Sequence, residues 1–175
     1  ETVLSKTAER IIGCPLIPFL QNKCFGIHQW AFTPRLSARD LVTALMMSWI
    51  LAVCCGSKVA AYWSDITGAF DRVARDYMLA KLFNAGIGTK YLNFLASYLQ
   101  PRKAVVVVEG ISSEEIEIAN QVFQGTVLGP PLWNTFFADV VHPASRLGGK
   151  PSIFADDLNV FQEFNRTIAN EDCKK

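Results

Sequence analysis

The stretch Ser152-Ile-Phe-Ala-Asp-Asp-Leu-Asn-Val-Phe161 decides the fold, because two adjacent acids interrupt what would otherwise be an apolar hairpin. Burying carboxylates in such a hairpin costs free energy unless something binds them. A divalent cation is the usual compensation, since hard cations prefer oxygen ligands and remove the repulsion between like charges. Asp156 and Asp157 are therefore candidate metal ligands, and a complete site needs a third acid from elsewhere in the chain.

Composition indicates a globular protein without an overall attraction for nucleic acid. The 175 residues and 50% hydrophobic content suit one domain with a full core. Seventeen basic and sixteen acidic residues leave a net charge of +1, so a nucleic-acid function has to rest on a site. The five cysteines have no paired CxxC spacing, which argues against zinc. Their odd number, without a secretory signal, favours a reducing intracellular compartment, cytoplasmic or nuclear.

The order of patterns along the chain predicts helices around a short antiparallel sheet. Ser37 is placed to cap a helix over residues 38–53, whose apolar run is shorter than the ~20 residues that span a bilayer, so no membrane is expected. A strand over residues 59–64 ends directly before Asp65. The remaining expectations are a helix over 2–20 limited by Pro15 and Pro18, a helix opened by Asp71 and stopped by Gly86, a helix over 89–99, a hairpin of strands 103–108 and 114–119, a helix over 132–141 ended by Pro143, and the acidic hairpin.

Two strand ends therefore deliver acids, Asp65 from one and Asp156 with Asp157 from the other, about ninety positions apart. Distant acids that converge on one sheet edge are typical of a metal site. In phosphoryl transfer, divalent ions held by carboxylates assist attack by an oxygen nucleophile and neutralise charge on the leaving phosphate. The acids thus predict nucleotidyl-transfer chemistry.

Three motifs carry a family resemblance: Asp65-Ile-Thr-Gly-Ala-Phe-Asp71, Gln124-Gly125 with Leu128-Gly129-Pro130, and Phe154-Ala-Asp-Asp157. Their order and their strand, loop-helix and hairpin contexts resemble the reverse transcriptases, above all those of non-LTR retrotransposons. Each motif alone is weak, whereas the three in order are a strong signal. Upstream, Gln29-Trp-Ala-Phe32 resembles the QxGF segment of these elements, with Ala31 where glycine is usual.

The resemblance implies an α+β polymerase palm, an antiparallel sheet backed by helices, with part of the fingers. We expect a fingers-like helical segment at 1–56, the palm core at 57–165 and a truncated tail at 166–175. The implied activity is RNA-directed DNA polymerisation, with Mg²⁺ as cofactor or Mn²⁺ in its place. The implied partners are an RNA template, a DNA primer and deoxynucleotides. Because the chain starts with Glu and ends in a polar stretch, we expect a fragment that lacks further fingers and the thumb.

The resemblance also assigns roles to individual residues. Asp65 and Asp156 would ligate the metal ions, Asp157 would support them, and the carbonyl of Ile66 would complete one coordination shell. Phe70 would act as a steric gate against a ribose 2′-hydroxyl. The implied nucleotide-binding residues are Gly68, Ala69, Phe70, Gln124 and Gly125, and the implied primer or template contacts are Phe154, Ala155 and Arg35.

Two alternatives remain open. The chain could be a non-catalytic relic of a retroelement, whose palm folds but lacks the segments needed for turnover. It could also be another palm-type polymerase, such as an RNA-directed RNA polymerase, although Phe70 and the Phe154-Ala-Asp-Asp157 sequence argue against that reading.

Overall fold

The structure, a computed structural model, describes residues 3–165, and the chain divides into two compact units. Unit 1 comprises Glu1–Cys24 and Gly68–Phe136, and unit 2 comprises Phe25–Thr67 and Phe137–Lys175. The division into a fingers-like segment, a palm core and a tail stays a prediction, and the tail at 166–175 lies outside the described residues.

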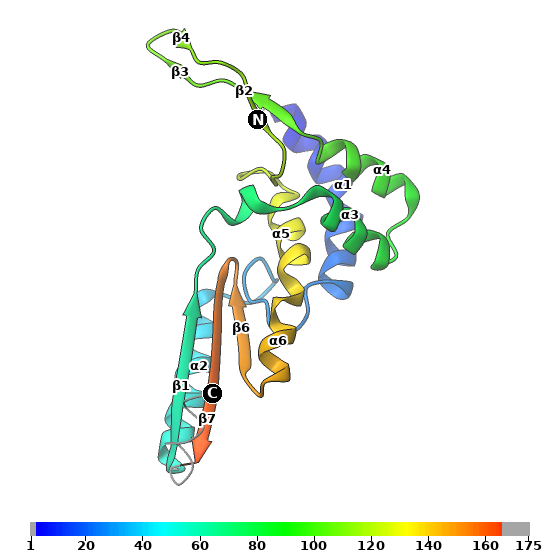
Figure 1. The fold of residues 1–175 in the computed structure, drawn as a ribbon. Helices are drawn as coiled ribbons and strands as arrows, with labels where there is room; N and C mark the ends of the chain where they lie inside the picture. Colours follow the sequence, from blue (N-terminus) through cyan, green and yellow to red (C-terminus); the bar gives the residue numbers. More distant parts are fainter. Residues whose placement is uncertain (1–2, 166–175) are drawn as a thin grey trace. The chain divides into compact units, whose positions relative to one another are not determined.

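Unit 2 is built on a three-stranded antiparallel sheet in the order β1 (Ser57–Ser64), β7 (Asp157–Asn165), β6 (Lys150–Phe154). Helix α2 (Ala38–Cys54) lies along one face of this sheet (Figure 1). Its Leu41 and Leu45 form the core of the unit with Phe161 of β7. The predicted strand before Asp65 and the predicted acidic hairpin are both confirmed.

Helix α2 starts where the sequence predicts, directly after Ser37. The Ser37 hydroxyl accepts a hydrogen bond from the Asp40 N–H at 3.3 Å, and the Asp40 carboxylate accepts one from the Ser37 N–H at 3.0 Å. This reciprocal capping box satisfies amide groups that a helix start otherwise leaves unpaired. The predicted cap is confirmed, and the helix ends one residue later than expected.

Unit 1 is mainly helical, and its core surrounds Trp133, which is 1% exposed. Its helices are α1 (Val3–Lys23), the 3-10 helix η1 (Ala69–Arg72), α3 (Arg75–Asn84), α4 (Thr89–Tyr98) and α5 (Gly129–Phe137). The other fully buried side chains of this unit include Leu20, Met78, Leu82, Leu95, Leu128 and Leu132.

The predicted N-terminal helix is confirmed as α1, which continues through Pro15 and Pro18 and ends three residues later than expected, because packing of one face outweighs the lost backbone hydrogen bonds. Two other local expectations are wrong. The helix expected from Asp71 is broken, because Val73 is extended at φ −76° and ψ 100° and buries its side chain before α3 starts. Pro143 does not end a helix: after the 3-10 helix η2 (Ala138–Val140), it lies in the first turn of α6 (Val141–Arg146), where its missing N–H is tolerated.

An antiparallel hairpin is present in unit 1 as predicted, but it consists of two short ladders, and β4 (Ile111–Ser112) lies where the turn was expected. Strand β2 (Arg102–Ala104) pairs with β5 (Ile116–Ile118), and β3 (Val107–Val108) pairs with β4. The turn lies at Glu109 and Gly110, both with positive φ, as expected for a tight hairpin whose twist matches its strands.

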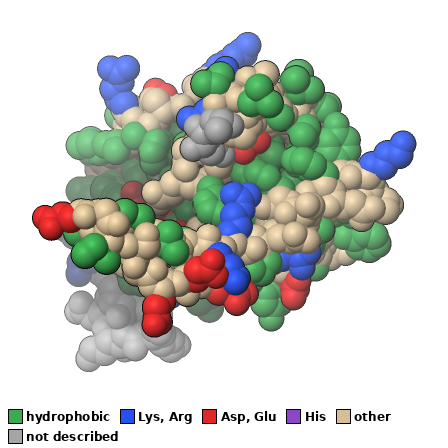
Figure 2. All heavy atoms as spheres, turned by 90° about the horizontal axis from the view of Figure 1, so that it is seen from above, with side chains coloured by type: hydrophobic (Ala, Val, Ile, Leu, Met, Phe, Trp, Pro, Cys, Tyr) green, Lys and Arg blue, Asp and Glu red, His purple; other side chains and the backbone are tan. Residues whose placement is uncertain are grey.

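Within the described residues 3–165, we find no helix that is long and apolar enough to cross a membrane. Figure 2 shows basic and acidic side chains scattered among hydrophobic and other side chains on the face that it draws. This distribution agrees with the near-zero net charge, so electrostatic attraction of a polyanion would have to be local.

Candidate active site

The three predicted catalytic acids lie in unit 2 at one end of its sheet. The β1–β7 ladder ends with Ser64 paired to Leu158, so Asp65 directly follows the last paired residue of β1 and Asp157 directly precedes Leu158 in β7. The β6–β7 hairpin closes with Phe154 paired to Asp157, which leaves Ala155 and Asp156 as its two-residue turn. Strand pairing therefore brings together acids that are far apart in the sequence.

Electrostatics within this edge agree with the register. The pKa of the Asp157 carboxyl is raised, first by partial desolvation and then by the negative charges of Asp156 and Asp65. A like charge raises the pKa of a carboxyl only when it lies nearby. Asp65 and Asp157 are exposed and Asp156 is half-buried, so the acids face solvent at this edge.

The acids suit a hard divalent cation, because they are oxygen donors whose mutual repulsion a cation would neutralise. Among residues 3–165, however, no three His, Cys, Asp or Glu groups are close enough together to hold a metal ion. The structure thus gathers the acids at one edge without closing them around an ion. Ile66, the predicted carbonyl ligand, is half-buried directly after Asp65.

Asp157→Asn is expected to raise the melting temperature of the metal-free protein at pH 7. A carboxyl with a raised folded-state pKa stabilises the fold while protonated, and this stabilisation is lost as the pH rises through that pKa. The side-chain amide of the Asp157→Asn variant does not ionise, so the variant does not lose this stabilisation as the pH rises. The gain should therefore be present at pH 7 and vanish near pH 3, below the ordinary carboxyl pKa of about 3.9.

Thermal unfolding in EDTA at the two pH values measures this difference. The matched control is Asp76→Asn, since Asp76 is an exposed acid of unit 1 whose side chain lies 3.5 Å from the Arg75 guanidinium. Its neutralisation should leave the melting temperature unchanged or slightly lower. A melting temperature for Asp157→Asn at or below that of the parent protein at pH 7 would contradict the prediction.

The predicted primer and template residues also belong to unit 2. Phe154 is half-buried and packs against the core cluster of Leu41, Leu45 and Phe161, so part of its ring supports the sheet. Ala155 occupies the turn with a φ of 57°. Arg35 is exposed in the loop before α2, with a φ of 68°.

The predicted nucleotide-binding residues all belong to unit 1. Gly68 has a φ of 66°, which favours glycine, and it directly precedes η1, in which Ala69 is buried. Phe70 stacks on Trp133 with ring centroids 5.7 Å apart. The Val122 N–H donates to the Phe70 carbonyl at 2.8 Å, which ties η1 to the chain that leads into the Gln124 loop.

The Gln124 loop is exposed at Gln124 and Gly125, and Gly125 has a φ of 80° that favours glycine. Its far end is held by Glu9 of α1, whose carboxylate accepts hydrogen bonds from the Val127 N–H at 2.7 Å and the Leu128 N–H at 3.4 Å. The role of Glu9 was not predicted, because an acid next to Arg10 in a helical pattern is typical of a surface residue.

Gln29 is the second polar residue that sequence reasoning did not place in the site. Its side-chain amide is buried in unit 2 and contacts the backbone of Ala155. In the sequence, the resemblance of Gln29-Trp-Ala-Phe32 to a family segment was the one feature that indicated a role for Gln29. Ala31, in the usual glycine position, is buried and does not have a positive φ, so glycine is not required there.

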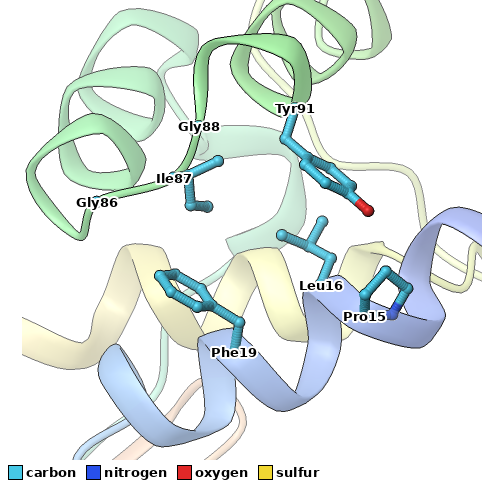
Figure 3. Close-up of a pocket in the computed structure, with 7 residues that line it drawn as sticks. All are labelled: Pro15, Leu16, Phe19, Gly86, Ile87, Gly88 and Tyr91. Atoms are coloured by element: carbon cyan, nitrogen blue, oxygen red, sulfur yellow. The ribbon is translucent and has the colours of Figure 1, made fainter.

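A pocket in unit 1 does not coincide with any predicted site residue. It measures about 140 Å³ and lies between α1 and the connection from α3 to α4. Figure 3 shows Leu16 and Phe19 of α1 facing Ile87 and Tyr91 across it. Its lining is apolar apart from the Tyr91 hydroxyl, so it lacks groups for acid–base or metal chemistry.

Comparison with known proteins finds relatives by sequence. The family model described as "Reverse transcriptase (RNA-dependent DNA polymerase)" matches residues 3–174. The chain is 29% identical over 162 residues to the probable RNA-directed DNA polymerase from transposon X-element of Drosophila melanogaster. It is 30% identical over 171 residues to the corresponding probable polymerase from transposon BS of the same organism. These alignments cover 90% and 93% of this chain but only 18% of each relative.

A solved structure supports the same assignment at the level of the fold. The apo telomerase of Candida tropicalis, truncated from its C-terminal domain, superposes with a TM-score of 0.63 at 10% sequence identity. The match covers 97% of this chain and 36% of the telomerase chain. At that identity the likeness concerns the fold, and it confirms the predicted α+β polymerase palm.

Proposed function

Because the chain belongs to the reverse transcriptase (RNA-dependent DNA polymerase) family, we propose that it supplies the catalytic palm of an RNA-directed DNA polymerase. The polymerase would join a deoxynucleotide to the 3′-hydroxyl of a DNA primer on an RNA template, with pyrophosphate leaving. The chain spans 18% of the length of each of these relatives, so the activity of a whole polymerase is part of this proposal.

The observation that carries the proposal is the convergence of three acids on one sheet edge. Asp65 directly follows the last paired residue of β1, Asp157 directly precedes the partner of that residue in β7, and Asp156 lies in the β6–β7 turn. The pKa of Asp157 is raised first by partial desolvation and then by the charges of Asp156 and Asp65, which supports the proposal that the three acids act together. Asp65 and Asp156 would hold divalent ions, with Asp157 in support and the Ile66 carbonyl as a further oxygen donor. When bound, Mg²⁺ or Mn²⁺ would supply activation of the primer hydroxyl and neutralisation of phosphate charge.

The exposed backbone at Gly68 and the Gln124–Gly125 loop suits contact with a nucleotide. Positive φ at Gly68 and Gly125 turns the chain without side chains that would obstruct a ligand. Phe70, whose ring is fixed against Trp133, is suited to exclude a ribose 2′-hydroxyl and so to select deoxynucleotides. Ala155, Phe154 and Arg35 would contact the primer and the template.

Primer extension by a full-length polypeptide that contains residues 1–175 tests the proposal. With an RNA template, a DNA primer and Mg²⁺, we expect extension by deoxynucleotides that stops on addition of EDTA. Ribonucleotides should be incorporated far less efficiently. Preferred incorporation of ribonucleotides would favour an RNA-directed RNA polymerase, and a complete lack of extension with either nucleotide would favour a non-catalytic relic.

A further inference from the structure

Gln29 is a polar side chain in the interior of unit 2, with an exposed fraction of only 2%. Its Oε1 accepts hydrogen bonds from the Ala155 N–H at 3.1 Å and from the Ala31 N–H at 3.0 Å. Its Nε2 donates to the Ala155 carbonyl at 3.4 Å. One buried amide therefore engages both backbone groups of the residue directly before Asp156.

The residue that Gln29 engages is held in an unfavourable conformation. Ala155 has a φ of 57°, in the left-handed region that L-residues other than glycine rarely adopt because their Cβ crowds the backbone. It is the first residue of the two-residue turn between β6 and β7, and Asp156 is the second. Such a conformation persists only where surrounding contacts over-determine it.

The chain around Gln29 is itself fixed to the same hairpin. The Ile153 N–H donates to the His28 carbonyl at 2.8 Å, and the Trp30 N–H donates to the Ile153 carbonyl at 2.9 Å. Gln29 thus forms a parallel bridge with Ile153, two residues before Ala155. The backbone on both sides of Gln29 is hydrogen-bonded to β6. The position from which the Gln29 side chain reaches the turn is therefore fixed.

We propose that Gln29 is a positioning residue that locks the Ala155–Asp156 turn and thereby orients the Asp156 carboxylate. The expected effect of Gln29 on catalysis rests on the proposed polymerase function. The structural part of the proposal, a clamp on a strained turn, is independent of any activity. Gln29 touches neither substrate nor metal in this role and acts through the backbone of Ala155.

A double-mutant cycle tests the clamp. Gln29→Met keeps the length of the side chain but removes the hydrogen bonds, and Ala155→Gly lets the turn adopt a positive φ without help. In the full-length polypeptide, Gln29→Met should lower kcat for primer extension about tenfold or more, with the KM for deoxynucleotide changed less than about twofold. In the Ala155→Gly background the same substitution should lower kcat by no more than about threefold.

The matched control is Thr33→Val, because the Thr33 hydroxyl donates to the Gln29 carbonyl at 3.0 Å without reaching the turn. This variant should keep the parent kcat. An equal loss of kcat on Gln29→Met in both backgrounds would mean that Gln29 supports the fold generally, and the proposal would then be wrong. Retention of the parent kcat by Gln29→Met would also overturn it.

Hydrogen–deuterium exchange provides the readout that does not depend on activity. In Gln29→Met, exchange should accelerate in a peptide over residues 153–158 and stay unchanged over 38–54, which contains α2. Unchanged exchange at 153–158, or faster exchange at both peptides, would refute the clamp. If the parent polypeptide extends no primer, the proposed function fails while this exchange comparison still decides the role of Gln29.

Discussion

Replacing Asp156 by alanine is expected to abolish Mg²⁺-dependent primer extension, lowering kcat by about a thousandfold or more. Asp156 is the acid in the β6–β7 turn, half-buried, and its charge contributes to the raised pKa of Asp157. In the proposed mechanism its carboxylate is a metal ligand that no neighbouring neutral group can replace. Single-nucleotide extension on an RNA template, in the full-length polypeptide, measures the loss.

Asp156→Asn separates the charge from the shape of the side chain. The amide is nearly isosteric, so it should unfold at a temperature close to that of the parent protein and yet lose most of the activity. Asp139→Ala is the matched control, since Asp139 also follows a Phe-Ala pair but is exposed in η2. Extension by Asp156→Ala at the parent rate would eliminate the metal assignment.

Replacing Trp133 by alanine is expected to destabilise the protein by about 3–5 kcal/mol, the largest effect on stability that we anticipate. The indole is 1% exposed, and its ring centroid lies 5.7 Å from that of Phe70 and 6.2 Å from that of Phe136. Its removal leaves a cavity in the centre of unit 1. Urea unfolding followed by circular dichroism measures the change in the free energy of unfolding.

Trp133→Phe should cost less than the alanine variant, because phenylalanine retains an aromatic ring to stack on Phe70. Tyr77→Ala is the exposed control, since this aromatic side chain is 72% exposed and should change stability by less than about 0.5 kcal/mol. Equal unfolding free energies for Trp133→Ala and Tyr77→Ala would contradict the central place given to Trp133 in the core.

Features that depend on short-range sequence were predictable. The Ser37 capping box needs only residues three positions apart, and the strand before Asp65 is a short run of apolar and aromatic residues. The convergence of the acids followed from placing each of them at a strand end. Local patterns therefore sufficed for the sheet and for placing the three acids next to its strand ends.

Features that depend on distant partners were not predictable. Glu9 reaches the backbone of a residue 118 positions away, and Gln29 one that is 126 positions away. A single helix or loop pattern contains no sign of such contacts. Similarly, burial of Val73 interrupts a helix that its periodicity favoured, and packing carries α1 past two prolines. Tertiary contacts prevailed over local preference in each case.

The position of Asp65 relative to Asp157 depends on the number of residues in β1. All eight residues of β1 are paired with β7, so inserting or deleting one residue in β1 while the pairing holds would turn Asp65 to the opposite face of the sheet. A change of two residues would restore the face but displace the carboxylate by about 7 Å along the strand. Strand β1 should therefore tolerate exchange of its side chains far better than any change of its length.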